Sequence, residues 1–557
     1  MTQERKNTVA KWDEDADFLV IGSGAAAVCA GLVAKKAGKR ALIVEKTEYF
    51  GGSTGMSGGV FWVPNNPVMK RAGVADSYEQ AKTYLDACAG EPIPGSTPER
   101  REAFLRTGPE TIAFLEDHGM ALVHAEGYSD YHEGEYPGGV ARSRSIVAKP
   151  FNRNELGAWK DRFRCRPGLP VMMHEIAQLT LNGATLKSKI AMVKVGLRIA
   201  QKAIGRDIVG MGGAIQGRLL QIALREGLDI WLDSGLVEFI IEGDRVVGGV
   251  VERNGERIRV RARDGVLINA GGFSHNQQMR EAHQLSPVTV DWTNANPGDT
   301  GEVMRMAMDL DAEVNVMEQS WWTLISILPN GMRATHPLEM SHPYSLMVDQ
   351  SGMRYVNESA SYLVHGWTMY NRNRTVPAIP SWFICDSRFR NRYRWAGLPP
   401  GEPPAEWLSS GYMIQADSLE SLAEKCNIPS DKLRATIERF NGFARTGHDE
   451  DFARGSGAYH RFLGDPTVKP NPNLGALEKP PFYAVRLYPG DVGTAGGLVT
   501  DEYARVQRAD GSIISGLYAT GNSTAPVVGR SYPGAGASIA ASIVFGYIAA
   551  RHALGVN

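Results

Sequence analysis

A glycine-spaced segment near the N-terminus has the residue types that bind phosphate groups. Gly22-x-Gly24-x-x-Ala27 follows the apolar run Asp17–Ile21 and opens an alanine-rich stretch that reaches Lys36. The first glycine permits a tight turn, the second lets the backbone approach a pyrophosphate, and the third small residue lets a helix pack on a strand. The partial positive charge at the start of that helix faces the phosphates. The predicted cofactor contacts here are Gly22, Gly24, Ala25, Ala26 and Ala27.

An acidic residue follows at the spacing that dinucleotide binding requires. Glu45 ends the next apolar run, Ala41–Val44, about twenty residues beyond the glycines, where a carboxylate can bond ribose hydroxyls. The glycine pattern alone is weak evidence, and an ordinary glycine turn is the alternative. Its position between a strand and a helix, with Glu45 after the second strand, predicts a βαβ unit that binds a dinucleotide.

A run of small residues after Glu45 favours FAD over NAD. Phe50–Gly59 reads FGGSTGMSGG, and a backbone with so few side chains can lie close to a flat ring and its ribityl chain. A flexible loop is the alternative. The run has no histidine, so we expect non-covalent flavin. The predicted contacts are Lys46, Gly52, Ser53, Thr54, Ser57, Gly58 and Gly59, together with Ala270, Gly271, Gly521, Asn522, Ala537 and Ser538 from later glycine turns and the last helix.

The elements that would position these residues come from both ends of the chain. Trp321–Leu487 is rich in aromatic residues and prolines, whereas Gly516–Asn522 and Ala537–Leu554 return to a buried strand and an apolar helix. We therefore predict an α/β fold, a Rossmann-like FAD-binding domain (1–321 and 491–557) interrupted by an α+β catalytic domain (322–490). Further predicted elements are a helix at Leu219–Gly227 and strands at Ile230–Ile241 and Arg245–Glu252.

Bulk composition excludes several classes of protein. The 557 residues exceed the size of one hydrophobic core, and a formal net charge of -1 gives no general attraction to nucleic acid. The five cysteines are scattered and never in CxxC spacing, so no disulfide framework, iron–sulfur cluster or metal site is predicted. Met1–Ala16 is polar, and no run of about 18 apolar residues could span a bilayer, so a cytoplasmic location is expected.

These motifs resemble the flavoproteins related to fumarate reductase. The similar segments are Glu45–Gly59, Thr494-x-Gly496-Gly497-Leu498 and Gly516–Asn522. Within that group the chain resembles the 3-ketosteroid Δ1-dehydrogenases over nearly its whole length, which implies an FAD domain split by a catalytic domain. Fumarate reductases carry histidine and arginine to hold carboxylates. This chain has no histidine beside Thr494–Leu498, so a dicarboxylate substrate is disfavoured.

The resemblance also implies three catalytic tyrosines. Tyr128-Ser-Asp-Tyr131 is similar to the family's aromatic-x-Asp-Tyr segment, and Asn357–Tyr362 is similar to the segment that bears its proton-abstracting tyrosine. Ser531-Tyr532-Pro-Gly-Ala-Gly536 is similar to its keto-binding segment and is the most specific match. The chain has 19 tyrosines, so the alternative for each is packing with the hydroxyl on a carbonyl or at the surface.

Residue chemistry agrees with these roles. Removing hydrogens from C1 and C2 of a 3-ketone requires a polarised carbonyl, and the Tyr532 hydroxyl with the Gly536 N–H could bind its oxygen as an oxyanion-hole pair. Tyr362 would take the C2 proton, with its pKa lowered or its proton relayed through Tyr131. Flavin N5 would accept hydride from C1. The substrate is expected to be a steroid or a sterol-derived ketone such as cholest-4-en-3-one, and the external electron acceptor is not specified by the sequence.

Three other functions remain open on the sequence alone. A 3-oxo-5α-steroid 4-dehydrogenase would reuse the tyrosines, because regiochemistry depends on how the substrate lies over the flavin. A fumarate-reductase-like flavin reductase and a flavin-binding membrane protein without turnover are the others. A structural flavoprotein has no need of phenols on three segments converging on one ring, which favours an enzyme.

A basic segment within the first domain, Lys187–Met211, forms part of a predicted insert at 183–211. Lys194, Arg198, Lys202 and Arg206 recur every four residues, while Ile190, Val193, Leu197 and Ile204 occupy another face, which predicts a basic amphipathic helix. A solvated surface helix is one interpretation. The other is peripheral contact with an anionic membrane at the inner face of the cell, which would suit a bulky sterol substrate.

Overall fold

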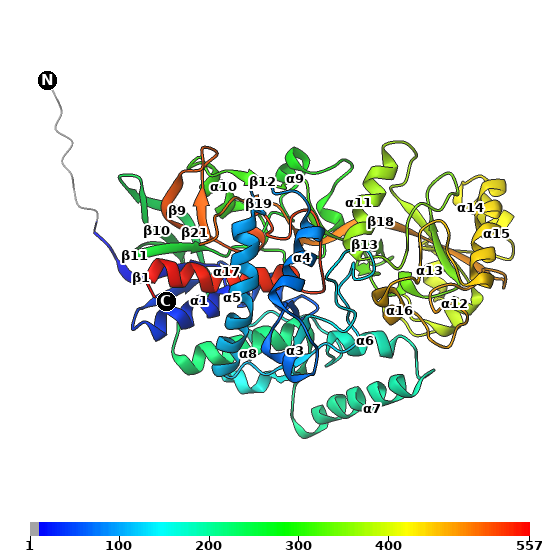
Figure 1. Cartoon of the computed structure of the whole chain (residues 1–557), viewed down its shortest axis with the longest axis horizontal. Helices are drawn as coiled ribbons and strands as arrows, with labels where there is room; N and C mark the ends of the chain where they lie inside the picture. Colours follow the sequence, from blue (N-terminus) through cyan, green and yellow to red (C-terminus); the bar gives the residue numbers. More distant parts are fainter. Residues whose placement is uncertain (1–10, 557) are drawn as a thin grey trace.

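The structure is a computed structural model that describes residues 11–556, and its strands are gathered mainly into two large sheets (Figure 1). The expectation for Met1–Ala16 falls mostly on residues 1–10, outside the described part. All five cysteines are free thiols.

The larger sheet combines strands from the two ends of the chain. Its order is β20-β21-β10-β11-β1-β2-β8, with β9 paired to β10. β1 pairs in parallel with β2 and β11, and its residues Phe18, Leu19 and Val20 are fully buried, as expected for a strand covered on both faces. The strands are β1 Glu14–Ile21, β2 Ala41–Val44, β8 Asp229–Trp231, β9 Ser234–Glu242, β10 Arg245–Arg253, β11 Glu256–Ile268, β20 Arg505–Gln507 and β21 Ile513–Ala519.

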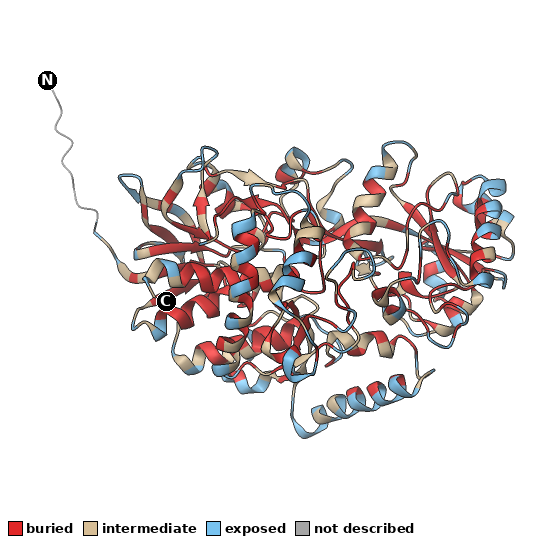
Figure 2. Ribbon diagram, in the orientation of Figure 1, coloured by how far each residue is buried: buried red, intermediate tan, exposed pale blue. Residues whose placement is uncertain are grey.

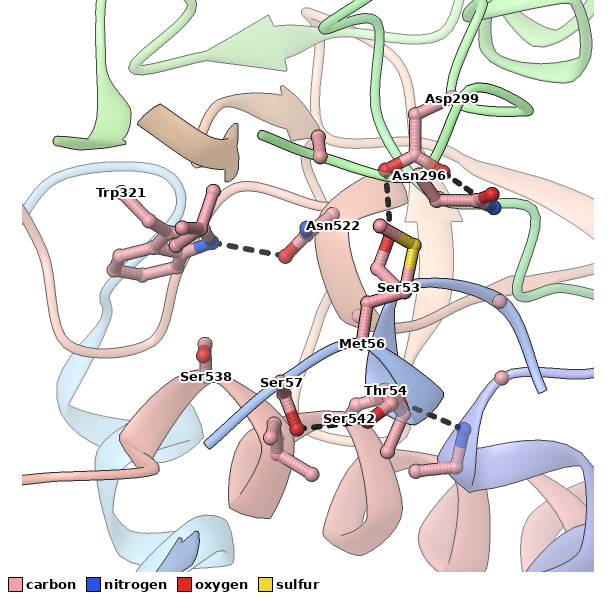
Figure 3. A pocket seen from close by; sticks show the side chains of 18 of the residues that line it. Ser53, Thr54, Met56, Ser57, Asn296, Asp299, Trp321, Asn522, Ser538 and Ser542 are labelled. Atoms are coloured by element: carbon pink, nitrogen blue, oxygen red, sulfur yellow. Dashed lines mark hydrogen bonds between the residues drawn. The ribbon is translucent and has the colours of Figure 1, made fainter. Parts of the chain in front are cut away.

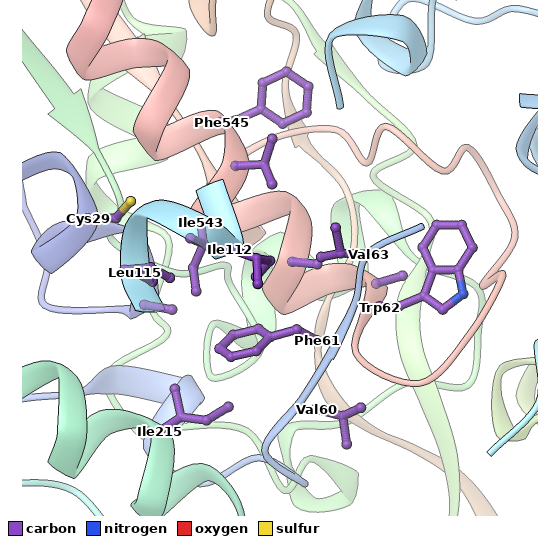
Figure 4. Packing of buried hydrophobic residues seen from close by; sticks show 14 of the residues in the cluster. Cys29, Val60, Phe61, Trp62, Val63, Ile112, Leu115, Ile215, Ile543 and Phe545 are labelled. Atoms are coloured by element: carbon purple, nitrogen blue, oxygen red, sulfur yellow. The ribbon is translucent and has the colours of Figure 1, made fainter. Parts of the chain in front are cut away.

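Two helices far apart in sequence pack on each other beside this sheet. α1 (Ala25–Lys36) and α17 (Ala537–Leu554) approach closely because Gly546 has no side chain, since a Cβ there would lie 2.6 Å from the Cβ of Ala26. Figure 4 shows Ile543 and Phe545 of α17 beside α5 (Pro98–Asp117) and β3 (Val60–Trp62). This packing holds the middle of α17 against the first turn of α1.

Helix α17 bears on the expectation that no apolar run spans a bilayer. Among the described residues it is the one helix long and apolar enough to cross a membrane, with a mean hydropathy of 1.3. The prediction required an unbroken apolar run, and scattered serine and arginine interrupt this one. Eleven of its 18 residues are buried, and most of these belong to the main hydrophobic core, so the apolar side chains of α17 pack inside the fold.

The second large sheet belongs to the middle of the chain. Its order is β14-β13-β18-β16-β15, with β17 on β18, and its pairings are antiparallel. The chain enters it at β13 and leaves it at β18, near the predicted boundaries at 321/322 and 490/491, and the division into domains stays a prediction. The elements are β13 Ser320–Ile327, β14 Arg333–Thr335, β15 Ser345–Val348, α11 Tyr362–Asn373, β16 Ser381–Asp386, β17 Met413–Ala416, α14 Leu419–Cys426, α15 Ser430–Thr446, α16 Ala458–Leu463 and β18 Phe482–Thr494.

Two predicted elements have different bounds. The strand expected over Ile230–Ile241 is divided at Asp233, whose φ is +52°, because β8 continues the parallel sheet beside β2 and β9 turns back to pair with β10. The helix expected at Leu219–Gly227 begins earlier, as α8 (Met211–Glu226).

The predicted basic helix is present only in part, as α7 (Leu186–Ala200), which lies at the edge of the molecule beyond α6 (Met173–Leu179) (Figure 1). Lys202 and Ile204 fall in a separate 3-10 turn, Gln201–Ile204, which ends at Gly205 with a φ of +77°, and Arg206 lies beyond that turn.

Most of α7 is exposed (Figure 2). Only Ser188, Ala191 and Val195 are buried, and they share the side that faces α6. Arg198 forms two hydrogen bonds to Glu175, of 2.5 and 2.8 Å, which tie α7 to α6.

Candidate active site

One pocket is lined both by the glycine turn after β1 and by the tyrosines. Figure 3 shows polar side chains on its wall, from Ser53 and Asp299 to Trp321 and Ser538. The pocket is lined by most of the predicted cofactor contacts: Gly22, Gly24, Ala25, Glu45, Lys46, Gly52, Ser53, Thr54, Ser57, Gly58, Gly59, Ala270, Gly271, Gly521, Asn522 and Ser538. It is also lined by Tyr131, Tyr362, Tyr532 and Gly536. Ala26, Ala27 and Ala537 are not among the lining residues. They are completely buried, and Ala26 instead contacts Gly546.

The turn before α1 has the geometry that close approach of a phosphate requires. Gly22 has a φ of +95°, and a Cβ at this position would lie 2.3 Å from the carbonyl oxygen of Asn269. α1 begins at Ala25 without a side-chain cap from Gly24, so its first N–H groups face the pocket with the helix dipole behind them. The residues present therefore fit the pyrophosphate of a dinucleotide.

Glu45 lies at the end of β2, where a ribose would be bound. Its carboxylate accepts hydrogen bonds from the Ser23 hydroxyl at 2.6 Å and from the Thr47 hydroxyl at 3.0 Å. It is 7% exposed and lines the pocket, so it is oriented by its neighbours and still reaches the cavity. Lys46 is engaged elsewhere, because its Nζ donates to Thr300 at 3.0 Å and pairs with Glu302.

A polar loop that the sequence prediction missed completes this side of the pocket. Asp299 accepts a 2.8 Å hydrogen bond from Ser53, and Asn296 lies beside it (Figure 3). Burial raises the pKa of Asp299 to about 7. The loop Asn294–Gly301 is as rich in small and polar residues as Phe50–Gly59, and that composition was the signal available in the sequence.

The three predicted tyrosines converge at the other end of the pocket. The ring centroids of Tyr131 and Tyr362 are 5.9 Å apart, those of Tyr131 and Tyr532 are 5.7 Å apart, and those of Tyr362 and Tyr532 are 5.6 Å apart. Tyr459 of α16 is a fourth member that the sequence did not indicate, 4.4 Å from Tyr131. The phenols form one cluster, which we call the tyrosine cluster (Tyr131, Tyr362, Tyr459 and Tyr532).

Backbone contacts hold two of these segments together. The Tyr131 N–H donates to the Pro533 carbonyl at 2.9 Å, and the Tyr84 hydroxyl donates to the same oxygen at 2.7 Å. Asp130 is buried, and accepts hydrogen bonds from Trp62 at 2.7 Å and Arg144 at 2.6 Å. The Asp130 carboxylate is therefore occupied by these hydrogen bonds, which orient the loop that carries Tyr131.

Gly534 and Gly536 let the last segment pass close to β3. A Cβ on Gly534 would lie 2.2 Å from the Trp62 ring, and one on Gly536, whose φ is +89°, would lie 2.1 Å from the Val60 carbonyl. Gly536 is the N-cap of α17, at the positive end of its dipole. The Tyr532 hydroxyl lies 3.1 Å from that of Ser538 in the first turn. A hydroxyl and a helix N-terminus therefore face the same end of the pocket.

The environment of the tyrosine cluster controls its protonation. Tyr131, Tyr459 and Tyr532 are buried, and Tyr362 is partly buried. Burial raises the pKa of the Tyr131 and Tyr362 phenols well above their ordinary value, and neighbouring phenols add to the shift. Trp321 packs on Tyr532 with its ring 5.0 Å away and donates to Asn522 at 2.9 Å (Figure 3). Such a site holds its phenols as hydrogen-bond donors at neutral pH.

A mixed sheet with a parallel β11-β1-β2-β8 portion carries the glycine turn and, after its second strand, an acid, and the pocket beside it reaches a cluster of phenols. Together these features define an FAD-dependent oxidoreductase. The FAD binding domain family model matches residues 17–539. The chain is 41% identical to 3-oxosteroid 1-dehydrogenase of Mycobacterium tuberculosis over 97% of this chain and 98% of the relative.

Two solved structures are similar. One is 3-ketosteroid Δ1-dehydrogenase from Sterolibacterium denitrificans with 1,4-androstadiene-3,17-dione, with a TM-score of 0.91 at 33% identity, covering 97% of this chain and 100% of that chain. The other is 3-ketosteroid-Δ4-(5α)-dehydrogenase from Rhodococcus jostii, with a TM-score of 0.70 at 22% identity, covering 99% of each chain, a likeness of fold alone. This chain belongs to the 3-oxosteroid 1-dehydrogenase family of FAD-binding flavoproteins. The predicted family, fold class and cofactor are confirmed.

Proposed function

We propose that this enzyme introduces a double bond between C1 and C2 of a 3-oxosteroid, with FAD as the hydride acceptor. The observation that carries the proposal is the convergence of Tyr131, Tyr362 and Tyr532 beside Gly536 at the end of the pocket. The relative from M. tuberculosis bears the name of this activity, and the similar solved structure contains 1,4-androstadiene-3,17-dione.

The chain's own groups perform the acid–base part of the reaction. The Tyr532 hydroxyl and the Gly536 N–H donate to the C3 oxygen, and each such donor contributes roughly 3–4 kcal/mol when charge develops on the oxygen. Their pull acidifies the C2–H. Tyr362 then takes the C2 proton, and Tyr131 lies close enough to share it. FAD, when bound, supplies the site to which the C1 hydride is transferred.

Because its pKa is raised, Tyr362 is a strong base once it is ionised. The same raised pKa means that only a small fraction of Tyr362 is phenolate at neutral pH. The phenolate fraction falls tenfold for each pH unit below the pKa, so the rate of C2 proton removal rises with pH. Tyr131 acts in the opposite direction to the other phenols, because its hydrogen bond to Tyr362 lowers the pKa of Tyr362 and so lowers the cost of forming the phenolate.

Product analysis tests this proposal against its main alternative. Purified enzyme is incubated with a 3-oxo-4-ene steroid and, separately, with a 5α-reduced 3-ketone, each with an artificial electron acceptor. We expect loss of two hydrogens and the absorbance of a 1,4-diene-3-one from the first substrate. A 4-ene product from the second substrate, with the first unchanged, would favour 4-dehydrogenation, and reduction of fumarate with neither steroid oxidised would favour the flavin reductase alternative.

The same segment that suggested membrane contact now has a defined outer face, and we propose that α7 docks on an anionic bilayer. Because Ser188, Ala191 and Val195 face the body, the side opposite them, at 100° per residue, carries Leu186, Ile190, Val193 and Leu197. Leu186 is 74% exposed and Leu197 is 64% exposed. Three exposed lysines border this stripe: Lys187, Lys189 and Lys194. The arrangement is typical of a helix lying in a membrane interface.

Arg198 does not belong to the basic face predicted from the sequence. It forms an ion pair with Glu175 and so helps to attach α7 to α6. Docking through α7 would place the enzyme where a sterol-derived ketone is dissolved, and a cholest-4-en-3-one-like substrate suits such a site.

Vesicle flotation tests the docking proposal. Wild-type enzyme is compared with Val193→Asp/Leu197→Asp on vesicles with and without phosphatidylglycerol, and the matched control is Met353→Asp/Leu408→Asp, two exposed apolar residues elsewhere. We expect wild type and control to float with anionic vesicles and the α7 variant to remain at the bottom. Equal recovery of all three proteins in the vesicle-free fraction would rule out the proposal.

A further inference from the structure

A second, smaller cavity lies behind the first turn of α17. It is lined by Arg100, Ala537, Ala541 and Phe545, and it shares Trp321, Gly521, Asn522 and Ser538 with the main pocket. Those four residues line both spaces. The small cavity therefore adjoins the end of the pocket where α17 directs its positive pole.

Arg100 brings a buried charge to this cavity without a counter-ion. It is 2% exposed, and no carboxylate lies within 4.0 Å of it among residues 11–556. Its guanidinium donates to the carbonyls of Gly95 and Ala525, the latter at 3.0 Å, and packs 4.7 Å from the centre of the Phe545 ring. Its Nε has no hydrogen-bond partner.

The guanidinium remains charged despite this environment. Burial lowers the pKa of Arg100 to about 10, which is still above neutral pH, and Asp501 raises it slightly from a distance. Asp501 is itself neutralised, because it pairs with Arg505 at 2.6 Å. A buried charge that lacks a partner is costly, and a negative charge formed nearby during function would offset that cost.

The helix dipole and Arg100 both bring positive charge to the N-terminal half of α17, where Ala537 and Phe545 line the small cavity with Arg100. The N-terminus of α17 carries a partial positive charge, and Arg100, in the first turn of α5, lies behind it. The described acids beside the main pocket, Glu45, Asp299 and Glu302, are held by Ser23, Ser53 and Lys46 in the glycine-turn region. The α17 end of the pocket is thus left with excess positive potential.

We infer that Arg100 is a positioning residue that raises the reduction potential of the bound flavin. Hydride transfer brings two electrons and one proton to a neutral isoalloxazine and leaves it with one negative charge, while the C2 proton goes to Tyr362. A fixed cation behind α17 stabilises that negative charge and favours hydride acceptance. The inference rests on the proposed function only in placing the flavin ring beside the start of α17.

The test measures the midpoint potential of the bound flavin by dye-coupled reduction of the intact holoenzyme. Arg100→Gln keeps a donor for the carbonyls and removes the charge, and Arg100→Lys keeps the charge. The matched control is Arg390→Gln, because Arg390 is also buried, has an unpaired Nε and donates only to carbonyls, those of Tyr393, Pro399 and Gly401. It lines neither cavity.

We expect Arg100→Gln to shift the ratio of oxidised to reduced flavin about tenfold towards the oxidised form, which is about 30 mV for a two-electron couple. Arg100→Lys and Arg390→Gln should keep the wild-type potential. An unchanged potential in Arg100→Gln, an equal shift in Arg390→Gln, or an equal shift in Arg100→Lys would each overturn the inference. If Arg100→Gln does not retain flavin, Arg100→Met is measured in its place under the same criteria.

Failure of the proposed function looks different from failure of this inference. Wild-type enzyme that binds flavin and oxidises no 3-oxosteroid would contradict the proposed reaction, whatever the potential of the variants. Turnover of steroid with identical potentials in wild type and Arg100→Gln would contradict only the role of Arg100.

Discussion

The two ends of the main pocket are built in different ways. At the glycine-turn end the backbone itself forms the site, through Gly22, the start of α1 and Phe50–Gly59, all within about the first tenth of the chain. At the other end, side chains from three distant segments meet, at Tyr131, Tyr362 and Tyr532. The first end depends on space for a cofactor's phosphates, and the second depends on where phenol oxygens lie. Substitutions should therefore separate cofactor binding from chemistry.

The largest expected effect is loss of flavin at the glycine-turn end. Gly22→Ala places a Cβ 2.3 Å from the Asn269 carbonyl in a φ of +95°, so the turn must move. We expect FAD affinity to fall at least tenfold, about 1.4 kcal/mol. The measurement is the ratio of flavin to protein absorbance after gel filtration. The control is Gly442→Ala, where a Cβ has open space. Normal flavin content in Gly22→Ala would show that the turn does not set cofactor affinity.

Tyr362→Phe should remove the base without disturbing flavin. General-base groups contribute roughly 10²–10⁴-fold, so we expect a loss of that order in kcat/KM. Because burial raises the pKa of Tyr362, the wild-type rate should increase from pH 7 towards alkaline pH, as the phenolate fraction grows. The variant should lose this slope. A pH profile identical in the two proteins would assign the base to another residue.

Tyr532→Phe should weaken ketone polarisation by removing one of two donors. A single oxyanion-hole donor is worth about 10²–10³-fold in rate, so we expect kcat to fall by that amount while the Gly536 N–H remains. Steady-state kinetics with flavin content as a reference measures it. Tyr503→Phe, a change at an exposed tyrosine, is the control. Full activity in Tyr532→Phe would remove it from the site.

Tyr459→Phe should have the smallest effect at the tyrosine end. Tyr459 does not line the pocket and contacts Tyr131 at a centroid distance of 4.4 Å, so it acts on the other phenols and not on substrate. We expect a decrease in kcat of less than about tenfold, with the pH profile moved to lower pH, because Tyr459 is one of the phenols that raise the pKa of Tyr362. A loss as large as that of Tyr362→Phe would place Tyr459 among the catalytic groups.

The sequence predicted more of the residues at the glycine-turn end of the pocket than at the tyrosine end. The glycine turn and Glu45 could be assigned from spacing, because adjacent residues set that backbone path. Ala26 and Ala27 were assigned with them, although only packing against Gly546 reveals which side of α1 Ala26 presents. Asp299 and Tyr459 were missed, since each reaches its place through a loop or helix whose position depends on the rest of the fold.

The amino-acid sequence by itself determined the dinucleotide turn, the cofactor, the family and the existence of an amphipathic helix near residue 190. Glycine spacing and hydrophobic periodicity are local signals, because they depend on residues that are close together in the chain. Tertiary structure decided which phenols meet, that Arg198 attaches α7 and leaves its apolar side outward, and that Arg100 is buried beside α17. Those outcomes depend on contacts between segments far apart in the chain, and packing alone selects which faces touch.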